Sequence, residues 1–194
     1  MSARTTYMII LVALMLSWGS MAGAQVIGSE HLGSFNGLSN NKVNAIYQDS
    51  HGFLWLGTND GLNRYDGYEF VVHRRLPTDS TTILSNYILS ISEDTASGHL
   101  WIGTNEGLSR YDPVTDHFAN YTFFEDQQPG QMSNRIYAVL AQHDTGVWIL
   151  MEDALLLFDP ETGVRCRCDL HSAFPGEDIT ARNAMLHADR YGQV

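Results

Sequence analysis

Three short polar segments recur along the chain and carry the side chains best suited to hold a ligand. They read Ser-Asn-Asn at 39–41, Ser-Asn-Tyr at 85–87 and Ser-Asn-Arg at 133–135. Amides, a phenol and a guanidinium form hydrogen bonds with hydroxyl and carboxylate groups, so these positions suit an acidic sugar or a similar ligand. The candidate binding residues are Asn40, Asn41, Asn86, Tyr87, Asn134 and Arg135. A structural role stays open, because Ser and Asn also shape the loop that leads into a strand.

No group of residues in the sequence indicates catalysis, a metal site or a cofactor. Six acidic residues recur at equivalent places, namely Asp49, Asp60, Asp66, Glu93, Glu106 and Asp112. We expect turns to account for them, since such side chains bond to nearby backbone and accept tight geometries. Calcium binding is the alternative, but the dense ligand run of an EF-hand loop is absent. A glycine-rich phosphate loop and a serine nucleophile elbow are absent as well.

The two cysteines, Cys166 and Cys168, form a Cys-Arg-Cys segment. Two thiols cannot complete the four-ligand set of a structural zinc site. Alternation along a strand places both on one face. We therefore expect half-buried core thiols, with a strained local disulfide in an oxidising compartment as the alternative.

An internal repeat reveals the elements that must position these residues. The motif Leu-Trp-(Leu/Ile)-Gly-Thr-Asn-(Asp/Glu)-Gly-Leu-x-Arg-Tyr-Asp occurs at 54–66 and again at 100–112. Trp55, Trp101 and Trp148 follow one another at intervals of 46 and 47 residues. That period fits one unit of four short strands with their turns, which is the length of a propeller blade. Helical repeats would need long stretches with apolar residues three and four apart, and none is present.

Turn chemistry favours four strands in each unit. Asp60-Gly61 and Asp66-Gly67 tolerate the positive φ angles of tight hairpins. They predict strands at roughly 43–47, 53–57, 62–65 and 69–73. The repeated tryptophan is expected to pack between adjacent blades, because a four-stranded sheet cannot bury both faces alone. The positions expected to carry the structural repeat are Trp55, Gly57, Gly61, Tyr65, Trp101, Gly103, Gly107, Tyr111 and Trp148.

The predicted fold class is all-β: β-propeller blades of four antiparallel strands in an incomplete ring of about three and a half blades. We expect a lead-in segment at 25–37, blades at 38–83, 84–131 and 132–177, and the truncated start of a fourth blade at 178–194. An incomplete ring leaves strand edges exposed, so the natural protein is expected to be longer. In the third copy Leu150-Met151 replace Gly-Thr and Ala154-Leu155 replace Gly-Leu, and its hairpin is expected to differ.

The N-terminus has the features of an export signal. Arg4 precedes an apolar run at 7–18, and Ala22-Gly23-Ala24 is a small-x-small cleavage signature. We predict a signal peptide at 1–24 and a periplasmic mature chain. An uncleaved membrane anchor is the alternative, although the run is short for a bilayer core that takes about 20 residues. The net charge of −11 argues against nucleic acid and anionic lipid as partners of this segment.

Over about residues 38–194 the repeat resembles the two-component regulator propeller repeat. The resemblance implies a large bacterial hybrid two-component system histidine kinase, whose periplasmic propeller senses breakdown products of polysaccharides and controls transcription by phosphorelay. It also implies a small-molecule or oligosaccharide ligand, a homodimer in the full-length protein, and membrane attachment only through parts outside this chain. The segment itself is then not an enzyme, although its parent is a kinase.

Three other functions stay open. A secreted propeller enzyme acting on polysaccharide, either a lyase or a glycosidase, would need converging acid and base groups such as two carboxylates about 5–10 Å apart. A secreted propeller that only scaffolds other proteins is the second. The third is the sensor region of a diguanylate cyclase.

Overall fold

The computed structural model describes residues 31–124, 133–142, 146–173 and 186. The chain divides into two compact units, residues 1–31 and 32–194. Apart from His31, every residue described below belongs to the second unit. The predicted signal peptide at 1–24 lies outside the described residues, and part of the lead-in segment forms the short 3-10 helix η1 (Ser34–Asn36). Among the described residues no helix is long and apolar enough to cross a membrane.

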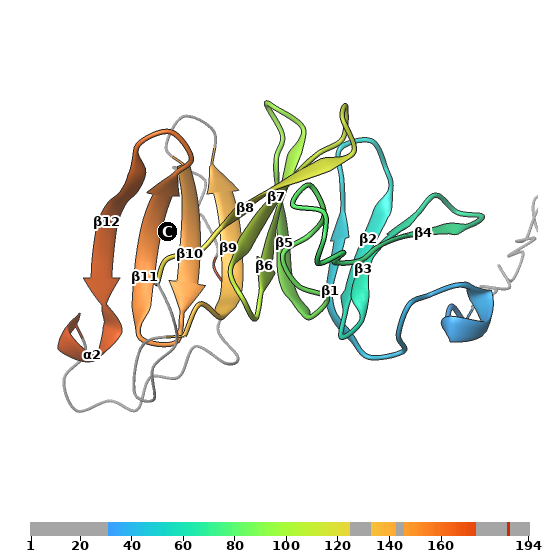
Figure 1. Ribbon diagram of the computed structural model, residues 1–194, viewed down its shortest axis with the longest axis horizontal. Coiled ribbons are helices and arrows are strands. Elements are labelled where there is room, and N and C mark those ends of the chain that lie inside the picture. Colours follow the sequence, from blue (N-terminus) through green and yellow to red (C-terminus); the bar gives the residue numbers. More distant parts are fainter. Residues whose placement is uncertain (1–30, 125–132, 143–145, 174–185, 187–194) are drawn as a thin grey trace, which may run out of the picture. The chain divides into compact units, whose positions relative to one another are not determined.

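Twelve strands form three antiparallel sheets of four strands each (Figure 1). The first sheet contains β1 (Val43–Gln48), β2 (Leu54–Thr58), β3 (Gly61–Tyr65) and β4 (Phe70–His73). The second contains β5 (Ile88–Asp94), β6 (His99–Thr104), β7 (Leu108–Asp112) and β8 (His117–Tyr121). The third contains β9 (Ile136–Gln142), β10 (Gly146–Met151), β11 (Ala154–Asp159) and β12 (Gly163–Asp169), followed by the short helix α2 (Leu170–Ala173).

Each sheet is a meander in which neighbours in sequence pair in space. The repeated tryptophan lies at the same register in all three: Trp55 pairs with Tyr47, Trp101 with Ser92 and Trp148 with Leu140. Three sheets with this order and register confirm the predicted all-β fold built from four-stranded blades. They make up about three blades of an incomplete propeller.

The sheets contact one another through their first strands. Contacts run from β1 to β5 and from β5 to β9, with further contacts from β2 to β5 and from β6 to β9. Figure 1 shows the three sheets following one another in sequence order. Strands that are first in sequence therefore lie innermost, as in the blades of a propeller.

Aromatic and aliphatic side chains fill the two seams between sheets. Trp55 is 1% exposed and lies in the first seam with Leu62, Ile88 and Tyr111. Trp101 lies in the second seam, where its ring centroid is 6.4 Å from that of Phe158 in β11. The core is thus divided between neighbouring sheets, and each blade depends on the next for its burial.

Two repeated glycines allow the sheets to approach closely. A Cβ atom at Gly57 would lie 2.5 Å from Ile88 Cγ2 in the next sheet, and one at Gly103 would meet Ser90 and Ile136. Real Cβ atoms do not approach that closely, so these positions accept only glycine without a shift of the neighbouring strand. The Gly-Thr step of the repeat is therefore a packing requirement between blades.

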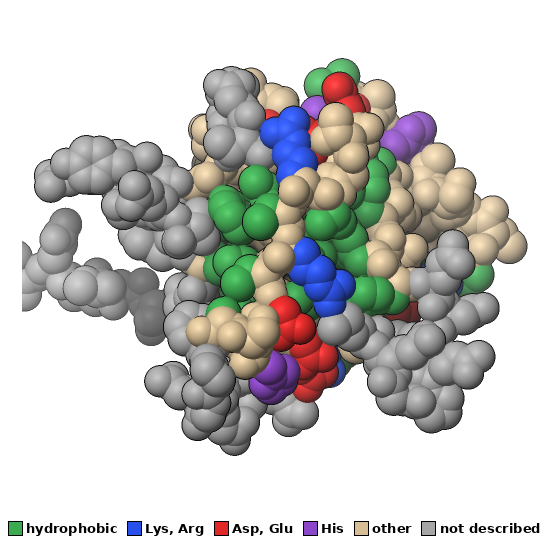
Figure 2. Space-filling model, turned by 90° about the vertical axis from the view of Figure 1, so that its left-hand side faces the viewer, with side chains coloured by type: hydrophobic (Ala, Val, Ile, Leu, Met, Phe, Trp, Pro, Cys, Tyr) green, Lys and Arg blue, Asp and Glu red, His purple; other side chains and the backbone are tan. Residues whose placement is uncertain are grey.

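The third sheet departs from this pattern on the face turned away from the second. Leu150 replaces the glycine and packs with Ala138 and Leu170. Leu186, the one described residue of 178–194, joins the same cluster. Figure 2 views the molecule from this side and shows hydrophobic side chains gathered on it, crossed by basic ones.

The hairpin of the third sheet also differs in backbone conformation. Gly61 and Gly107 begin the third strands of their sheets with φ of 125° and 146°, in a region that side chains rarely adopt. In the third sheet Ala154 takes the position of these glycines, and its φ is not positive. Among the described residues other than glycine, positive φ occurs at Asp116.

The expectation for the cysteines was wrong. Cys166 and Cys168 are free and exposed on β12, which is an edge strand of its sheet. They pair with Leu157 and Leu155, but no fifth strand covers β12 in the described part of the chain. Strand alternation places both thiols on one face but does not reveal that the strand is an edge.

Candidate ligand-binding rim

The three polar segments lie beside the hairpins that join the second and third strands of the sheets. The Lys42 carbonyl accepts a hydrogen bond from the Asn59 amide (3.3 Å), and the Tyr87 carbonyl accepts one from the Asn105 amide (3.2 Å). In the third sheet Ser133 lines the same small hollow as the hairpin residue Asp153. We call this surface, made of segments 39–42, 85–87 and 133–135 and hairpins 58–61, 104–107 and 151–154, the crossover rim.

Adjacent blades are tied together along the crossover rim. The Gly61 amide donates to the Asn86 carbonyl at 2.8 Å, which joins the first hairpin to the second crossover segment. The Asn44 side chain donates to Asn59 Oδ1 at 2.9 Å and to the Ile88 carbonyl at 2.8 Å. Hydrogen bonds therefore join the rim segments of the first and second blades.

In the first blade the two candidate asparagines make local bonds. Asn40 Oδ1 accepts a hydrogen bond from the Lys42 amide at 2.8 Å. Asn41 Oδ1 accepts one from the Ser34 amide at 2.8 Å, and Asn41 is exposed. Within the described ranges both side chains use only the amide oxygen, which leaves the NH2 groups available to a ligand.

Asn86 and Asn134 bind the backbone of the preceding blade. Asn86 Oδ1 accepts a hydrogen bond from the Arg75 amide at 2.8 Å. Asn134 is buried, and its Oδ1 accepts bonds from the Phe123 and Phe124 amides (2.8 and 3.0 Å), while its Nδ2 donates to the Phe124 carbonyl (2.9 Å). These bonds give both residues a structural task at the crossover, which accounts for the repetition of Ser-Asn.

Tyr87 and Arg135, the two residues that vary between copies, come together in space. The Arg135 guanidinium carbon lies 5.4 Å from the centroid of the Tyr87 ring. It lies 5.3 Å from the ring of Tyr137, a residue that the sequence did not single out. All three side chains are half-buried. The rim thus contains a cation in contact with aromatic rings from two neighbouring blades.

Hairpin residues add further polar groups that sequence reasoning missed. Ser85 Oγ lies 2.6 Å from Asn105 Oδ1. Asp60 accepts a hydrogen bond from Arg74 at 3.1 Å, and Glu106 accepts one from Arg75 at 2.8 Å. The signal in the sequence is the recurrence of Asn-Asp, Asn-Glu and Glu-Asp between the second and third strands. The turn role expected for Asp60 and Glu106 does not include their bonds to arginines.

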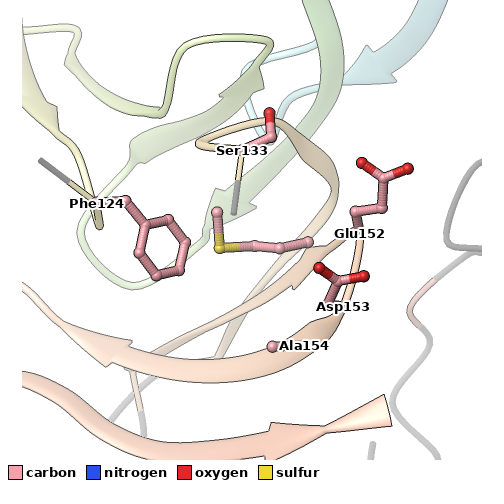
Figure 3. A pocket seen from close by; sticks show the side chains of 6 residues that line it. Phe124, Ser133, Glu152, Asp153 and Ala154 are labelled. Carbon is pink, nitrogen blue, oxygen red and sulfur yellow. The ribbon is translucent and has the colours of Figure 1, made fainter. Parts of the chain in front are cut away.

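The small hollow at the third hairpin does not hold a ligand by itself. Figure 3 shows Ser133, Glu152 and Asp153 around it, with the Phe124 ring at its side. Its volume is ≈ 10 Å³, which is room for about one water molecule. Any ligand of the rim must therefore lie on the surface across the segments.

The turn interpretation of the recurring carboxylates fits three of them. Asp49, Asp66 and Asp112 accept hydrogen bonds from backbone amides within their own turns. Glu93 differs, because it is buried and accepts bonds from the amide and hydroxyl of Ser50 (2.9 and 2.6 Å) in the first sheet. By strand register the counterpart of Asp49 is Asp94. From the sequence we treated Asp49 and Glu93 as equivalent, but they occupy different positions in their blades.

The first seam contains titratable groups with shifted pKa values. Burial lowers the pKa of His73, while Asp116, whose carboxylate lies 3.8 Å from Nδ1, opposes that shift. Burial raises the pKa of Tyr111, whose hydroxyl donates to Asp116 at 2.9 Å. Over the described ranges no three His, Cys, Asp or Glu side chains group in a way that could hold a metal ion.

Comparison with known proteins bears out the resemblance suggested by the repeat. Residues 37–60 match the sequence profile of the family described as two component regulator propeller. A stretch of 48 residues is 52% identical to part of a histidine kinase of Formosa agariphila. That stretch is 25% of this chain and 4% of the kinase.

Two solved extracellular domains have a similar fold. One, from a protein of B. thetaiotaomicron assigned as a hybrid two component system, is 28% identical with a TM-score of 0.62, and the match covers 75% of this chain and 20% of that domain. Another, from a protein of B. thetaiotaomicron assigned as a one component system, shares the fold at 23% identity and a TM-score of 0.58 over 78% of this chain and 22% of that one. The chain thus spans about a fifth of the solved domains that it matches.

Proposed function

We propose that this two-component regulator propeller segment is the ligand-sensing part of a hybrid two-component histidine kinase, located in the periplasm. The matching profile, the kinase relative and the extracellular domains with the same sheets support this proposal. The segment recognises a carbohydrate breakdown product, and its parent controls transcription by phosphorelay. The segment performs no chemistry on the ligand.

The crossover rim is the proposed binding surface. The observation that carries this assignment is that hydrogen bonds and a cation–π contact join the polar segments of successive blades. Sugars present many hydroxyl groups, and donors and acceptors fixed by hydrogen bonds recognise them at low cost in conformational entropy. The signal follows if the ligand binds one arrangement of a homodimer more tightly than the other, because only unequal affinity shifts the balance between the two.

Calorimetric titration of the full chain tests the proposal. The probes are neutral oligosaccharides of glucose, galactose and xylose, and oligomers of galacturonate and glucuronate. Tyr87→Ala on the rim is expected to lower the affinity of a bound oligosaccharide at least about tenfold, which corresponds to about 1.4 kcal/mol. Tyr68→Ala is the matched control, since Tyr68 is 94% exposed in the turn between β3 and β4. Flat traces with every probe would contradict sugar recognition by the rim.

A further inference from the structure

Arg135 is held at the crossover rim in a way that leaves its charge unpaired. Its guanidinium carbon lies 5.4 Å from the centroid of the Tyr87 ring and 5.3 Å from that of the Tyr137 ring. The Nε atom is buried and has no hydrogen-bond partner. The two rings attract the cation through their π faces but accept no hydrogen bond in the plane of the guanidinium.

Two arginines outside the rim segments are paired with carboxylates of the rim hairpins. Arg74 bonds to Asp60 at 3.1 Å and Arg75 to Glu106 at 2.8 Å. No carboxylate within the described ranges forms a salt bridge with Arg135, in a chain whose formal charge is −11. A half-buried guanidinium that lacks an acceptor has lost part of its hydration without replacement. A bound anion would supply the missing acceptor and replace the lost hydration.

The geometry selects the shape of that anion. Two aromatic rings lie against the guanidinium, and its N–H groups form a planar fork along its edge, where an anionic partner binds. A carboxylate is planar and matches this fork with two parallel hydrogen bonds.

We propose that Arg135 makes the crossover rim selective for saccharides that carry a carboxylate, that is, for uronic acids and their oligomers. This inference rests on the proposed function and narrows its ligand class. Arg135 binds the carboxylate, and the two tyrosines hold the guanidinium in the plane in which it can do so. The three residues come from both sides of the second seam, so a bound uronate bridges the second and third blades.

The test is calorimetric titration of the full chain with trigalacturonate and with its neutral counterpart galactotriose. Trigalacturonate is expected to bind at least about tenfold more tightly, and the difference is expected to shrink as salt rises. Arg135→Gln is expected to weaken trigalacturonate binding by about 30-fold or more and to leave galactotriose unchanged within about twofold. Arg135→Lys keeps the charge but not the fork and is expected to lose about tenfold. Arg74→Gln removes a paired arginine that lies outside the rim segments; it is the matched control and is expected to change neither affinity beyond about twofold.

The outcomes separate the two proposals. If galactotriose binds as tightly as trigalacturonate and Arg135→Gln affects neither, the rim binds sugars but this inference is overturned. If a sulfated galactose oligomer binds as tightly as trigalacturonate with the same dependence on Arg135, the selectivity is for anions in general and the carboxylate assignment is overturned. If neither the acidic nor any neutral oligosaccharide binds, the proposed function itself fails. If Arg135→Gln loses the circular dichroism spectrum of the folded chain, Arg135→Lys replaces it as the test. Unchanged trigalacturonate affinity in Arg135→Lys would then overturn this inference.

Discussion

Trp55 in β2 lies edge-on to Tyr111 in β7, with the ring centroids 5.2 Å apart and the ring planes at 60°. The first residue belongs to the first blade and the second to the next, and both are almost fully buried. Edge-to-face geometry of this kind is favourable beyond the area it buries. This contact shows that the stability of one blade includes side chains of its neighbour.

Trp55→Ala is therefore expected to lower the free energy of unfolding by about 3–5 kcal/mol, because it removes a large buried ring and leaves a cavity in the first seam. Urea unfolding followed by far-ultraviolet circular dichroism measures the loss. Trp148→Ala is the control: Trp148 holds the same register but is only half-buried on the outer face of the third sheet, so it is expected to cost no more than about 2 kcal/mol. Equal losses would contradict the assignment of the seam.

Gly57→Ala is expected to destabilise the chain by about 1–3 kcal/mol, since the new Cβ would overlap Ile88 Cγ2. Ile88→Ala removes the obstructing atom. The double variant Gly57→Ala, Ile88→Ala should therefore lose at least about 1 kcal/mol less than the sum of the two single variants in the same urea experiment. Strict additivity would mean that the two sheets do not meet at this glycine.

Acid is expected to weaken the first seam through His73. Its side chain is 11% exposed and stacks on Trp55, and burial holds its pKa in the folded chain below the ordinary 6.5. The unfolded chain then binds the proton more readily than the folded chain, so stability is complete above about pH 6.5 and falls as the pH drops from there toward the lowered pKa. Urea unfolding at pH 7.5, 6.5, 5.5 and 5.0 measures this slope.

His73→Phe keeps an aromatic ring in the seam and removes the titration, so it should flatten that part of the pH dependence. His51→Phe is the control, because His51 is exposed, and it should leave the slope as it is in the unmodified chain. An unchanged slope in His73→Phe would show that other groups cause the acid sensitivity.

Asn134→Ala is expected to cost about 2–4 kcal/mol, because three backbone groups at Phe123 and Phe124 lose their partner in a buried position. Asn41→Ala removes one exposed hydrogen bond and is expected to change stability by no more than about 0.5 kcal/mol. Thermal unfolding of both variants gives the comparison. A harmless Asn134→Ala would remove the structural explanation for the repeated Ser-Asn and favour a role in ligand binding.

The sequence alone established the repeat, and the repeat determined most of the fold. Tryptophans 46 and 47 residues apart set the length of the unit, and the two Asp-Gly turns of the first unit predict its four strands. Strands β1 to β4 agree with the predicted ranges within a residue or so. This succeeded because strand alternation and turn chemistry are local properties. The resemblance to the two-component regulator propeller repeat also followed from short runs of neighbouring residues, without any knowledge of the fold.

Tertiary structure decided which repeated residues serve the scaffold and which are available to a ligand. Asn41 and Asn134 occur in similar segments, yet one is exposed with a single bond and the other is buried with three. Glu93 was expected to serve a turn, but it accepts a hydrogen bond from Ser50 across the first seam. Cys166 was expected in the core, but it is exposed on the edge strand β12. Tyr137 joins Arg135 and Tyr87 only because the second and third sheets meet at this angle and register. Such contacts depend on how whole sheets pack, and the spacing of residues within one segment does not encode that.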